Sequence, residues 1–240
     1  MTLHLIYRIS NNSYNSLREP YVTKESCLGN ALRTFPPSKA IQWIILGDTL
    51  NRETKKMILK KIAGMPFLRF FPMEIGSNAG SFNQALDLAL ALASNDLVYM
   101  LEDDYLHITG AYPLIEDGLE FLRADYVSLY DHPDKYVPST EGGNPFIDQS
   151  GGEETKVFRG RYRHWKLTNS TTMTFAARVR TLQEDEPILR KWTTGTHPLD
   201  YQLFLELKDK GRLLMTSLPG ASTHGDTAWI APFTDWAKLA

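Results

Sequence analysis

The sequence of 240 residues has little cysteine, no strong charge of either sign and no long hydrophobic run. Its single cysteine, Cys27, excludes a disulfide framework and a zinc cluster built from cysteines. Lysine and arginine number 26 and aspartate and glutamate number 28, so the net charge of −2 provides no global field to attract nucleic acid. The most apolar helical stretch, Ala85–Ala93, is far shorter than the ~20 residues of a membrane span. Met1–Tyr7 lacks the pattern of a signal peptide. We therefore expect a cytoplasmic protein with no transmembrane segment and no nucleic-acid partner.

The first half of the chain alternates short apolar segments with helical patterns. The predicted strands are Leu3–Ile9, Ile41–Leu46, Phe67–Met73, Leu97–Leu101 and Tyr126–Tyr130. The predicted helices are Thr23–Phe35, Asn51–Ala63, a helix capped by Ser81 that runs to Ser94, and Tyr112–Arg123. This alternation is typical of βαβ units. We expect an α/β fold with a Rossmann-type, mainly parallel sheet flanked by helices.

The second half has a different pattern. Ser139–Thr155 contains four glycines, four acids and no lysine or arginine, which predicts a loop that is mobile without ligand. Two antiparallel strands and two helices are predicted after it, at Lys156–Trp165, Thr171–Ala177, Val179–Trp192 and Leu199–Lys210. The first of these strands would place Arg159, Arg161 and Arg163 on one face, and we favour a solvated hairpin face over a phosphate site. No repeat or linker divides the chain, so we predict one domain, 1–240.

Three adjacent carboxylates, Glu102-Asp103-Asp104, follow the apolar strand Leu97–Leu101. Two like charges 4 Å apart cost ~1 kcal/mol in water and ~4 kcal/mol near a protein surface. A divalent cation would remove that repulsion, and carboxylate oxygens suit Mg²⁺ or Mn²⁺. Ligands of open α/β sheets bind at the carboxyl ends of strands. The triplet is therefore a candidate metal site, with a solvated acidic loop as the alternative.

The segment Ile75–His107 resembles the central segment of family 2-type glycosyltransferases with the GT-A fold. In that family an Asn-x-Gly-type loop opens a helix, and a buried strand then ends in an acidic DxD-type motif, which here is Glu102-Asp103-Asp104. The resemblance extends more weakly to Leu3–Ser10 and Trp43–Asp48 and covers roughly half of the chain. It implies a GT-A-like domain with a nucleotide-sugar-binding half, 1–130, and an acceptor-binding and catalytic half, 131–240.

The resemblance also implies roles for individual residues. Asp104 would bind the Mn²⁺ or Mg²⁺ that bridges the diphosphate of a nucleotide-sugar, and Asp103 would lie at the ribose. Asp48 would contact the nucleotide base, with Arg8 and Ser10 beside the same pocket.

Asn78 and His224 are two further candidates. Asn78 would lie near the nucleotide, although bracing its own loop is the interpretation we favour. Asn83 and Asp87, on the following helix, are assigned structural roles. Some GT-A enzymes complete the metal site with a histidine near the C-terminus, and His224 is the candidate here. A structural histidine is the alternative.

The segment His197-Pro198-Leu199-Asp200 precedes the last predicted helix. Many GT-A enzymes place an acid there beneath the acceptor, so the resemblance implies that Asp200 is the general base. The alternative for Asp200 is stabilisation of the helix dipole. His197 is a candidate to orient or replace Asp200. Glu184-Asp185-Glu186, a rival acidic cluster before Pro187, is predicted to be a solvated face.

These features together predict an enzyme that moves a sugar from a nucleotide-sugar donor, UDP-linked, to a glycan or other hydroxyl acceptor. Mn²⁺ or Mg²⁺ would act as a Lewis acid on the departing diphosphate. Asp200 as base would give inversion at the anomeric carbon, and retention stays open. A nucleotidyltransferase of related fold is one alternative, although Ile9–Ser13 lacks the glycines of its phosphate loop. A non-catalytic nucleotide- or glycan-binding domain of the same fold is the other.

Overall fold

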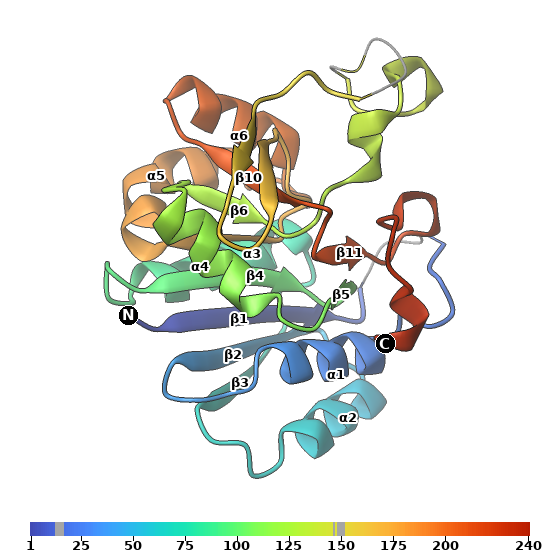
Figure 1. The fold of residues 1–240 in the computed structure, drawn as a ribbon. Helices are drawn as coiled ribbons and strands as arrows, with labels where there is room; N and C mark the ends of the chain where they lie inside the picture. The colour runs from blue at the N-terminus through green and yellow to red at the C-terminus, as the bar shows by residue number, and fades with distance from the viewer. Residues whose placement is uncertain (13–16, 146, 148–151) are drawn as a thin grey trace.

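The computed structural model describes residues 1–12, 17–145, 147 and 152–240 (Figure 1). Within them, a nine-stranded sheet has the order β3-β2-β1-β4-β9-β6-β10-β8-β7, and β11 pairs with β5 in a second sheet. The strands are β1 (Leu3–Ser10), β2 (Ile41–Asp48), β3 (Leu68–Met73), β4 (Leu97–Glu102), β5 (Tyr105–His107), β6 (Tyr126–Ser128), β7 (Val157–Arg159), β8 (His164–Leu167), β9 (Phe175–Arg178), β10 (Leu214–Leu218) and β11 (Ser222–His224). In the large sheet only β8 and β9 run against the other described strands. The α/β class with a mainly parallel sheet is confirmed.

Helices cover both faces of this sheet. They are α1 (Lys24–Thr34), α2 (Arg52–Ile62), α3 (Asn78–Leu90), α4 (Tyr112–Glu116), which continues as a π-helical turn at Asp117–Phe121, α5 (Val179–Lys191) and α6 (Asp200–Asp209). Residues of α1, α2 and α4 pack into one core, and residues of α3, α5 and α6 pack into the other. Side chains of a strand alternate between faces, so Leu5 and Tyr7 of β1 enter the first core and Ile6 enters the second.

The helix after the Gly76–Gly80 loop begins earlier than the sequence predicts. Ser77, rather than Ser81, is its N-cap, and the Ser77 side chain accepts a hydrogen bond from the Gly80 backbone N–H. Ser81 is buried inside α3. A serine at either position would satisfy the capping pattern, and the earlier start places Asn78 in the first turn, against the end of β4.

The predicted strand Lys156–Trp165 is wrong. The segment forms a hairpin of β7 and β8 that turns between Gly160 and Arg163, where the Gly160 N–H donates to the Arg163 carbonyl. Asp117 accepts hydrogen bonds from the Arg161 N–H and the Trp165 indole, and a Cβ at Gly160 would lie 2.3 Å from that carboxylate. The three arginines therefore do not share one face of a strand.

The predicted strand Thr171–Ala177 is antiparallel, but its partners are different. Its ordered part, β9, lies between β4 and β6 and does not pair with the β7–β8 hairpin. Phe175, Ala176 and Ala177 are all fully buried there, with Ala176 in the first core and Ala177 in the second. This insertion joins the two halves of the large sheet.

Part of the predicted mobile loop, at 146 and 148–151, lies outside the described residues, so its mobility stays a prediction. Its described ends are fastened to the rest of the structure. The Glu153 N–H donates to the Lys135 carbonyl, and the Glu153 carboxylate is 2.8 Å from Lys166 Nζ. Among the residues that the structure describes, no helix combines the length and apolar character needed to cross a membrane.

Candidate functional site

The carboxyl ends of β1, β2 and β4 open into a cavity of about 980 Å³. All seven residues predicted to bind the donor or the metal line it: Arg8, Ser10, Asp48, Asn78, Asp103, Asp104 and His224. Strand register explains part of this convergence, because Arg8 lies opposite Glu102 and Ser10 lies opposite Asp48. Asp200 is not among the residues that line the cavity, although Thr172 and His197 are.

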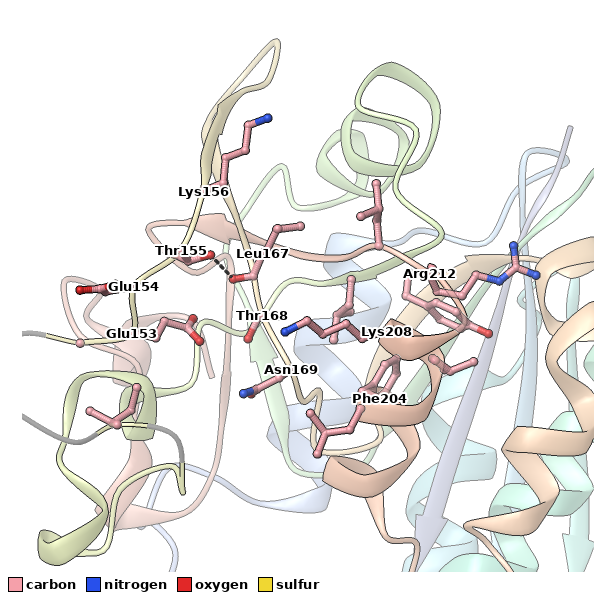
Figure 2. A pocket seen from close by; sticks show the side chains of 18 residues that line it. Glu153, Glu154, Thr155, Lys156, Leu167, Thr168, Asn169, Phe204, Lys208 and Arg212 are labelled. Carbon is pink, nitrogen blue, oxygen red and sulfur yellow. Dashed lines mark hydrogen bonds between the residues drawn. The ribbon is translucent and has the colours of Figure 1, made fainter.

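A second cavity, of about 750 Å³, lies between α6 and the segments 152–156 and 167–169, which flank the β7–β8 hairpin. Figure 2 shows Phe204 and Lys208 projecting from α6 toward the segment Leu167–Asn169. Within the described part of the chain, none of the residues predicted to bind donor or metal lines this space. The first cavity is therefore the candidate site.

Glu102, the first acid of the triplet, is held by Arg8 and Asn78. Arg8 Nη2 donates to Glu102 Oε1 at 2.7 Å, and Asn78 Nδ2 donates to the same oxygen at 3.1 Å. Arg8 Nη1 also donates to the Asn78 side-chain oxygen at 2.7 Å. The Arg8 side chain is only 5% exposed, so this group joins β1, β4 and α3 at the floor of the cavity.

Asp103, the second acid, is paired with Lys24 at the start of α1. Lys24 Nζ lies 2.6 Å from Asp103 Oδ2, and the Ser10 N–H donates to that oxygen at 3.1 Å. Thr23 caps α1 through a reciprocal pair of hydrogen bonds with Ser26, which fixes where Lys24 begins the helix. The structure thus places Ser10 beside Asp103 as well as opposite Asp48.

Asp104, the third acid, faces both Arg18 and His224. Arg18 Nη2 is 2.9 Å and His224 Nε2 is 3.2 Å from the same oxygen, Oδ2. The other oxygen, Oδ1, is buried and has no hydrogen-bond partner among the described residues. Since Asp104 is 8% exposed, this is a buried acceptor left unpaired beside a cavity.

The segment that carries His224 returns from the C-terminal part of the chain. In Figure 1, β11 lies beside β5, and the antiparallel pair places His224 opposite Tyr105. A Cβ at Gly225 would lie 2.4 Å from Val22 and 3.0 Å from the Asp104 carbonyl, so only glycine permits this close approach. This packing brings Asp104 and His224 into contact although they are 120 residues apart in the sequence.

The electrostatics separate Asp104 from its neighbours. Burial raises the pKa of Glu102 and Asp103, although Arg8 and Lys24 oppose it. Burial would also raise the pKa of Asp104, but His224 and Arg18 hold that pKa below its usual range. The Asp104 carboxylate in turn raises the pKa of His224 against the effect of burial. Asp104 is therefore the acid of the triplet that stays ionised most readily.

Asp48 lines the cavity, and its carboxylate also holds the loop before α3. Oδ1 accepts from the Ile75 N–H at 2.7 Å, and Oδ2 accepts from the Gly76 N–H at 3.0 Å. Asp48 is 1% exposed. Its predicted contact with a nucleotide base stays a prediction, and the hydrogen bonds present show a carboxylate that shapes the pocket wall.

The Asp200 carboxylate accepts four hydrogen bonds from the segment 171–173. The donors are the N–H groups of Thr171, Thr172 and Met173 and the Thr171 hydroxyl, at 2.6–3.1 Å. Thr172 and Met173 have φ angles of 50° and 55°, which is a strained conformation for a β-branched residue followed by a bulky one. Asp200 therefore holds a strained turn, one residue of which, Thr172, lines the cavity.

The residues fit a divalent cation at Asp104. Within the described chain no group of three or more His, Cys, Asp or Glu side chains is arranged to hold a metal. Mg²⁺, however, is commonly bound through one or two carboxylates, with substrate phosphates and waters completing the shell. The unpaired Asp104 Oδ1 offers one such ligand. His224 Nε2 would add a nitrogen ligand once it loses the proton it shares with Asp104 Oδ2.

Sequence reasoning missed Arg18 and Lys24, which pair with two of the three acids. No motif surrounds either residue. Their position follows from the segment between β1 and α1, where an isolated bridge joins Arg18 to Asp226. The triplet is therefore already paired with basic side chains of the chain, which the repulsion argument did not include.

No protein-family model matches this chain, and no curated protein matches it. Solved structures do. GalNAc-T7 with UDP, GalNAc and Mn²⁺ is similar over 93% of this chain and 43% of its own, with a TM-score of 0.59 and 12% identity. S. aureus TarS 1–349 is similar over 95% of this chain and 59% of its own, with a TM-score of 0.54 and 17% identity. The 4-diphosphocytidyl-2C-methyl-D-erythritol synthase of Anaerococcus prevotii is similar over 98% and 91%, with a TM-score of 0.52 and 15% identity.

The chain spans less than two thirds of the two glycosyltransferase chains it resembles, 59% and 43%. At these identities the likeness concerns architecture. It extends over 93–98% of this chain, and so includes the nine-stranded sheet and the helices on its two faces. The chain therefore has the GT-A fold, as its resemblance to GT-A glycosyltransferases predicts.

Proposed function

We propose that this chain is a metal-dependent glycosyltransferase that takes a UDP-linked sugar and transfers it to the hydroxyl of a glycan or other acceptor. One observation carries the proposal. Seven residues chosen from the sequence converge on one cavity, and among them Asp104 has a buried carboxylate oxygen without a partner. The architecture shared with TarS and with the UDP- and Mn²⁺-containing GalNAc-T7 structure supports it.

In this proposal Asp104 and His224 hold Mn²⁺ or Mg²⁺. The bound cation would supply charge compensation for the departing nucleoside diphosphate. Asp103, beside the Ser10 backbone, would face the ribose, and Asp48 would lie at the base end of the cavity. Arg8 and Asn78 form the floor of the cavity beneath Glu102. Their hydrogen bonds to Glu102 hold the carboxyl end of β4 against the first turn of α3.

The acceptor hydroxyl has to lose a proton to a base. We keep Asp200 as the proposed base for an inverting reaction, with His197, which lines the cavity, as the alternative. A carboxylate has about four lone-pair positions, and Asp200 uses that number to hold residues 171–173. Asp200 would therefore have to release at least one of these hydrogen bonds before it took a proton.

Titration calorimetry with UDP tests the proposal. UDP should bind with Mn²⁺ present, and the affinity should fall when EDTA replaces the metal, because the diphosphate and Asp104 then lose their shared cation. Equal affinity under both conditions would exclude the metal-bridged site. Incubation with a panel of nucleotide-sugars should then show slow, metal-dependent hydrolysis for the true donor.

A nucleotidyltransferase is the second candidate, and one finding favours it. The synthase from Anaerococcus prevotii is similar over 98% of this chain and 91% of its own, a more even overlap than either glycosyltransferase gives. Product analysis separates the two activities. A glycosyltransferase releases a nucleoside diphosphate from a nucleotide-sugar. A nucleotidyltransferase joins a nucleoside triphosphate to a sugar phosphate and releases pyrophosphate from the triphosphate.

A further inference from the structure

Each acid of the triplet already has a basic partner within the chain. Glu102 pairs with Arg8, Asp103 with Lys24 and Asp104 with Arg18. The repulsion among three carboxylates is therefore relieved before any ligand enters. A cation that binds at Asp104 has to compete with a guanidinium that is already there.

Arg18 differs from the other two basic residues in its position. It lines the cavity, whereas Lys24 does not. Its side chain is 21% exposed, against 5% for Arg8. Arg18 therefore has access to whatever fills the cavity, while Arg8 is locked into the floor.

The backbone beside Arg18 is anchored while its side chain reaches the cavity. The Thr227 N–H and hydroxyl both donate to the Leu17 carbonyl at 3.0 Å. The backbones of Arg18 and Asp226 also pair as an isolated antiparallel β-bridge. The same C-terminal segment supplies His224. Arg18 and His224 thus reach one carboxylate oxygen, Asp104 Oδ2, from two segments that are tied together.

Arg18 and His224 already share Asp104 Oδ2, so a divalent cation on the unpaired Oδ1 would add a third positive group beside one carboxylate. The repulsion between the cation and the guanidinium would weaken the Arg18–Asp104 pair and favour release of Arg18. The nucleotide that comes with the metal provides a new partner, since guanidinium binds phosphate oxygens through two parallel hydrogen bonds and is weakly hydrated. A move of the Arg18 side chain from Asp104 to the diphosphate would keep every charge paired.

We propose that Arg18 is a donor-binding residue that changes partner. It neutralises Asp104 when the site is free of ligand, and it binds the diphosphate when metal and nucleotide are bound. This role rests on the proposed function, because it requires a diphosphate in the cavity. Arg18 would therefore weaken the binding of the metal alone and strengthen the binding of the nucleotide together with the metal.

Two calorimetric titrations test this role in the full chain, with Arg18→Met compared against wild type and against Lys24→Met. Lys24 is the matched control, because its loss removes the same charge from the neighbouring acid without removing a group that lines the cavity. The first titration adds Mn²⁺ without nucleotide. The second adds UDP in saturating Mn²⁺. Melting temperatures, with Arg18→Lys as a second variant that keeps the charge, show that each protein is folded.

Arg18→Met should bind Mn²⁺ alone at least about tenfold more tightly than wild type, because its competitor is gone. It should bind UDP in saturating Mn²⁺ about 10- to 100-fold more weakly, the usual loss for a hydrogen bond to a charged group. Lys24→Met should change both affinities clearly less, and Arg18→Lys should lie between Arg18→Met and wild type. Equal shifts for Arg18→Met and Lys24→Met would overturn the partner exchange and leave a general charge effect. If wild type itself binds no UDP, the proposed function fails instead.

Discussion

The chain contains two acidic triplets, Glu102-Asp103-Asp104 and Glu184-Asp185-Glu186, and their central difference is how their carboxylates are paired. Asp185 is fully buried and accepts from the Tyr126 hydroxyl at 2.8 Å, Lys210 Nζ at 2.5 Å and Arg212 Nε at 2.8 Å. Asp104 is almost as buried, lines a cavity and keeps one oxygen unpaired.

The second triplet corrects a prediction from the sequence. The sequence predicts a solvated face before Pro187, and Glu184 is exposed as expected, but α5 continues through Pro187 and Asp185 is fully buried. The long-range partners Lys210 and Arg212, beyond α6, make this possible. Buried charge alone therefore does not mark a functional site. A buried acid becomes a candidate ligand when its hydrogen-bonding capacity is left incomplete beside a space.

The largest effect is expected for Asp104→Asn. The substitution keeps the shape of the side chain but removes the charge and one acceptor oxygen, so metal-dependent binding of UDP should disappear. Calorimetry with UDP in Mn²⁺ and in EDTA should give the same weak affinity for this variant. A melting temperature near that of wild type would show that the loss is local. A variant that retained the metal-dependent gain would place the metal elsewhere.

Asp200→Asn tests a third carboxylate, which resembles Asp185 in being fully hydrogen-bonded. If Asp200 is the base, sugar transfer should fall by ~10²–10⁴-fold while UDP affinity stays nearly unchanged. The amide can accept through only one atom, so the 171–173 turn also loses part of its support. The pH profile of transfer distinguishes the two causes, because loss of a base removes its acidic limb and loss of a support does not. A near wild-type rate would refute the catalytic assignment and move it to His197.

Asp185→Asn should act on stability and leave the donor site intact. Breaking a buried ion pair by removing one partner typically destabilises by ~3–5 kcal/mol. The change is measured as a shift in the urea unfolding midpoint. Glu184→Gln is the matched control, because this exposed acid pairs with Arg212 at the surface, where such pairs contribute about 0–1 kcal/mol. UDP affinity of the folded Asp185→Asn protein should equal that of wild type; a weakened affinity would show that the two triplets are coupled.

The local pattern of the sequence was sufficient for the first half of the fold. Period-2 and period-3.6 hydrophobic patterns located β1, β2, β4, α1 and α2, because each is decided by its own residues. The second half was harder because its strands are short and their partners are remote. β9 pairs with β4 and β6, which are far from it in the sequence. No residue pattern within Phe175–Arg178 indicates which strands it pairs with.

The candidate site shows the same division. Asp103 and Asp104 were found because acids at the end of a buried strand of a parallel sheet mark a ligand site. Asp48 was found through the resemblance to GT-A glycosyltransferases. Arg18 and Lys24 were missed because their place depends on the packing of an irregular segment and a helix end. The environment of Asp200 was also out of reach, since it depends on two strained residues in another segment. The division into halves 1–130 and 131–240 stays a prediction.

The smallest effect is expected for His224→Ala. His224 touches the same Asp104 oxygen as Arg18, and it belongs to a short strand whose pairing with β5 uses backbone hydrogen bonds. Removing the imidazole should therefore leave the strand in place and weaken only the metal shell. A residue that supports a ligand without being the principal one typically contributes 10- to 100-fold in metal affinity. Mn²⁺ titration should give that loss, with some metal-dependent UDP binding retained, in contrast to Asp104→Asn. His4→Ala is a control, because that buried histidine pairs with Asp96 at the opposite end of β1, and its loss should leave Mn²⁺ affinity unchanged. If His224→Ala alters neither Mn²⁺ affinity nor sugar transfer, the histidine is structural and Asp104 remains the chain's own anchor for the metal.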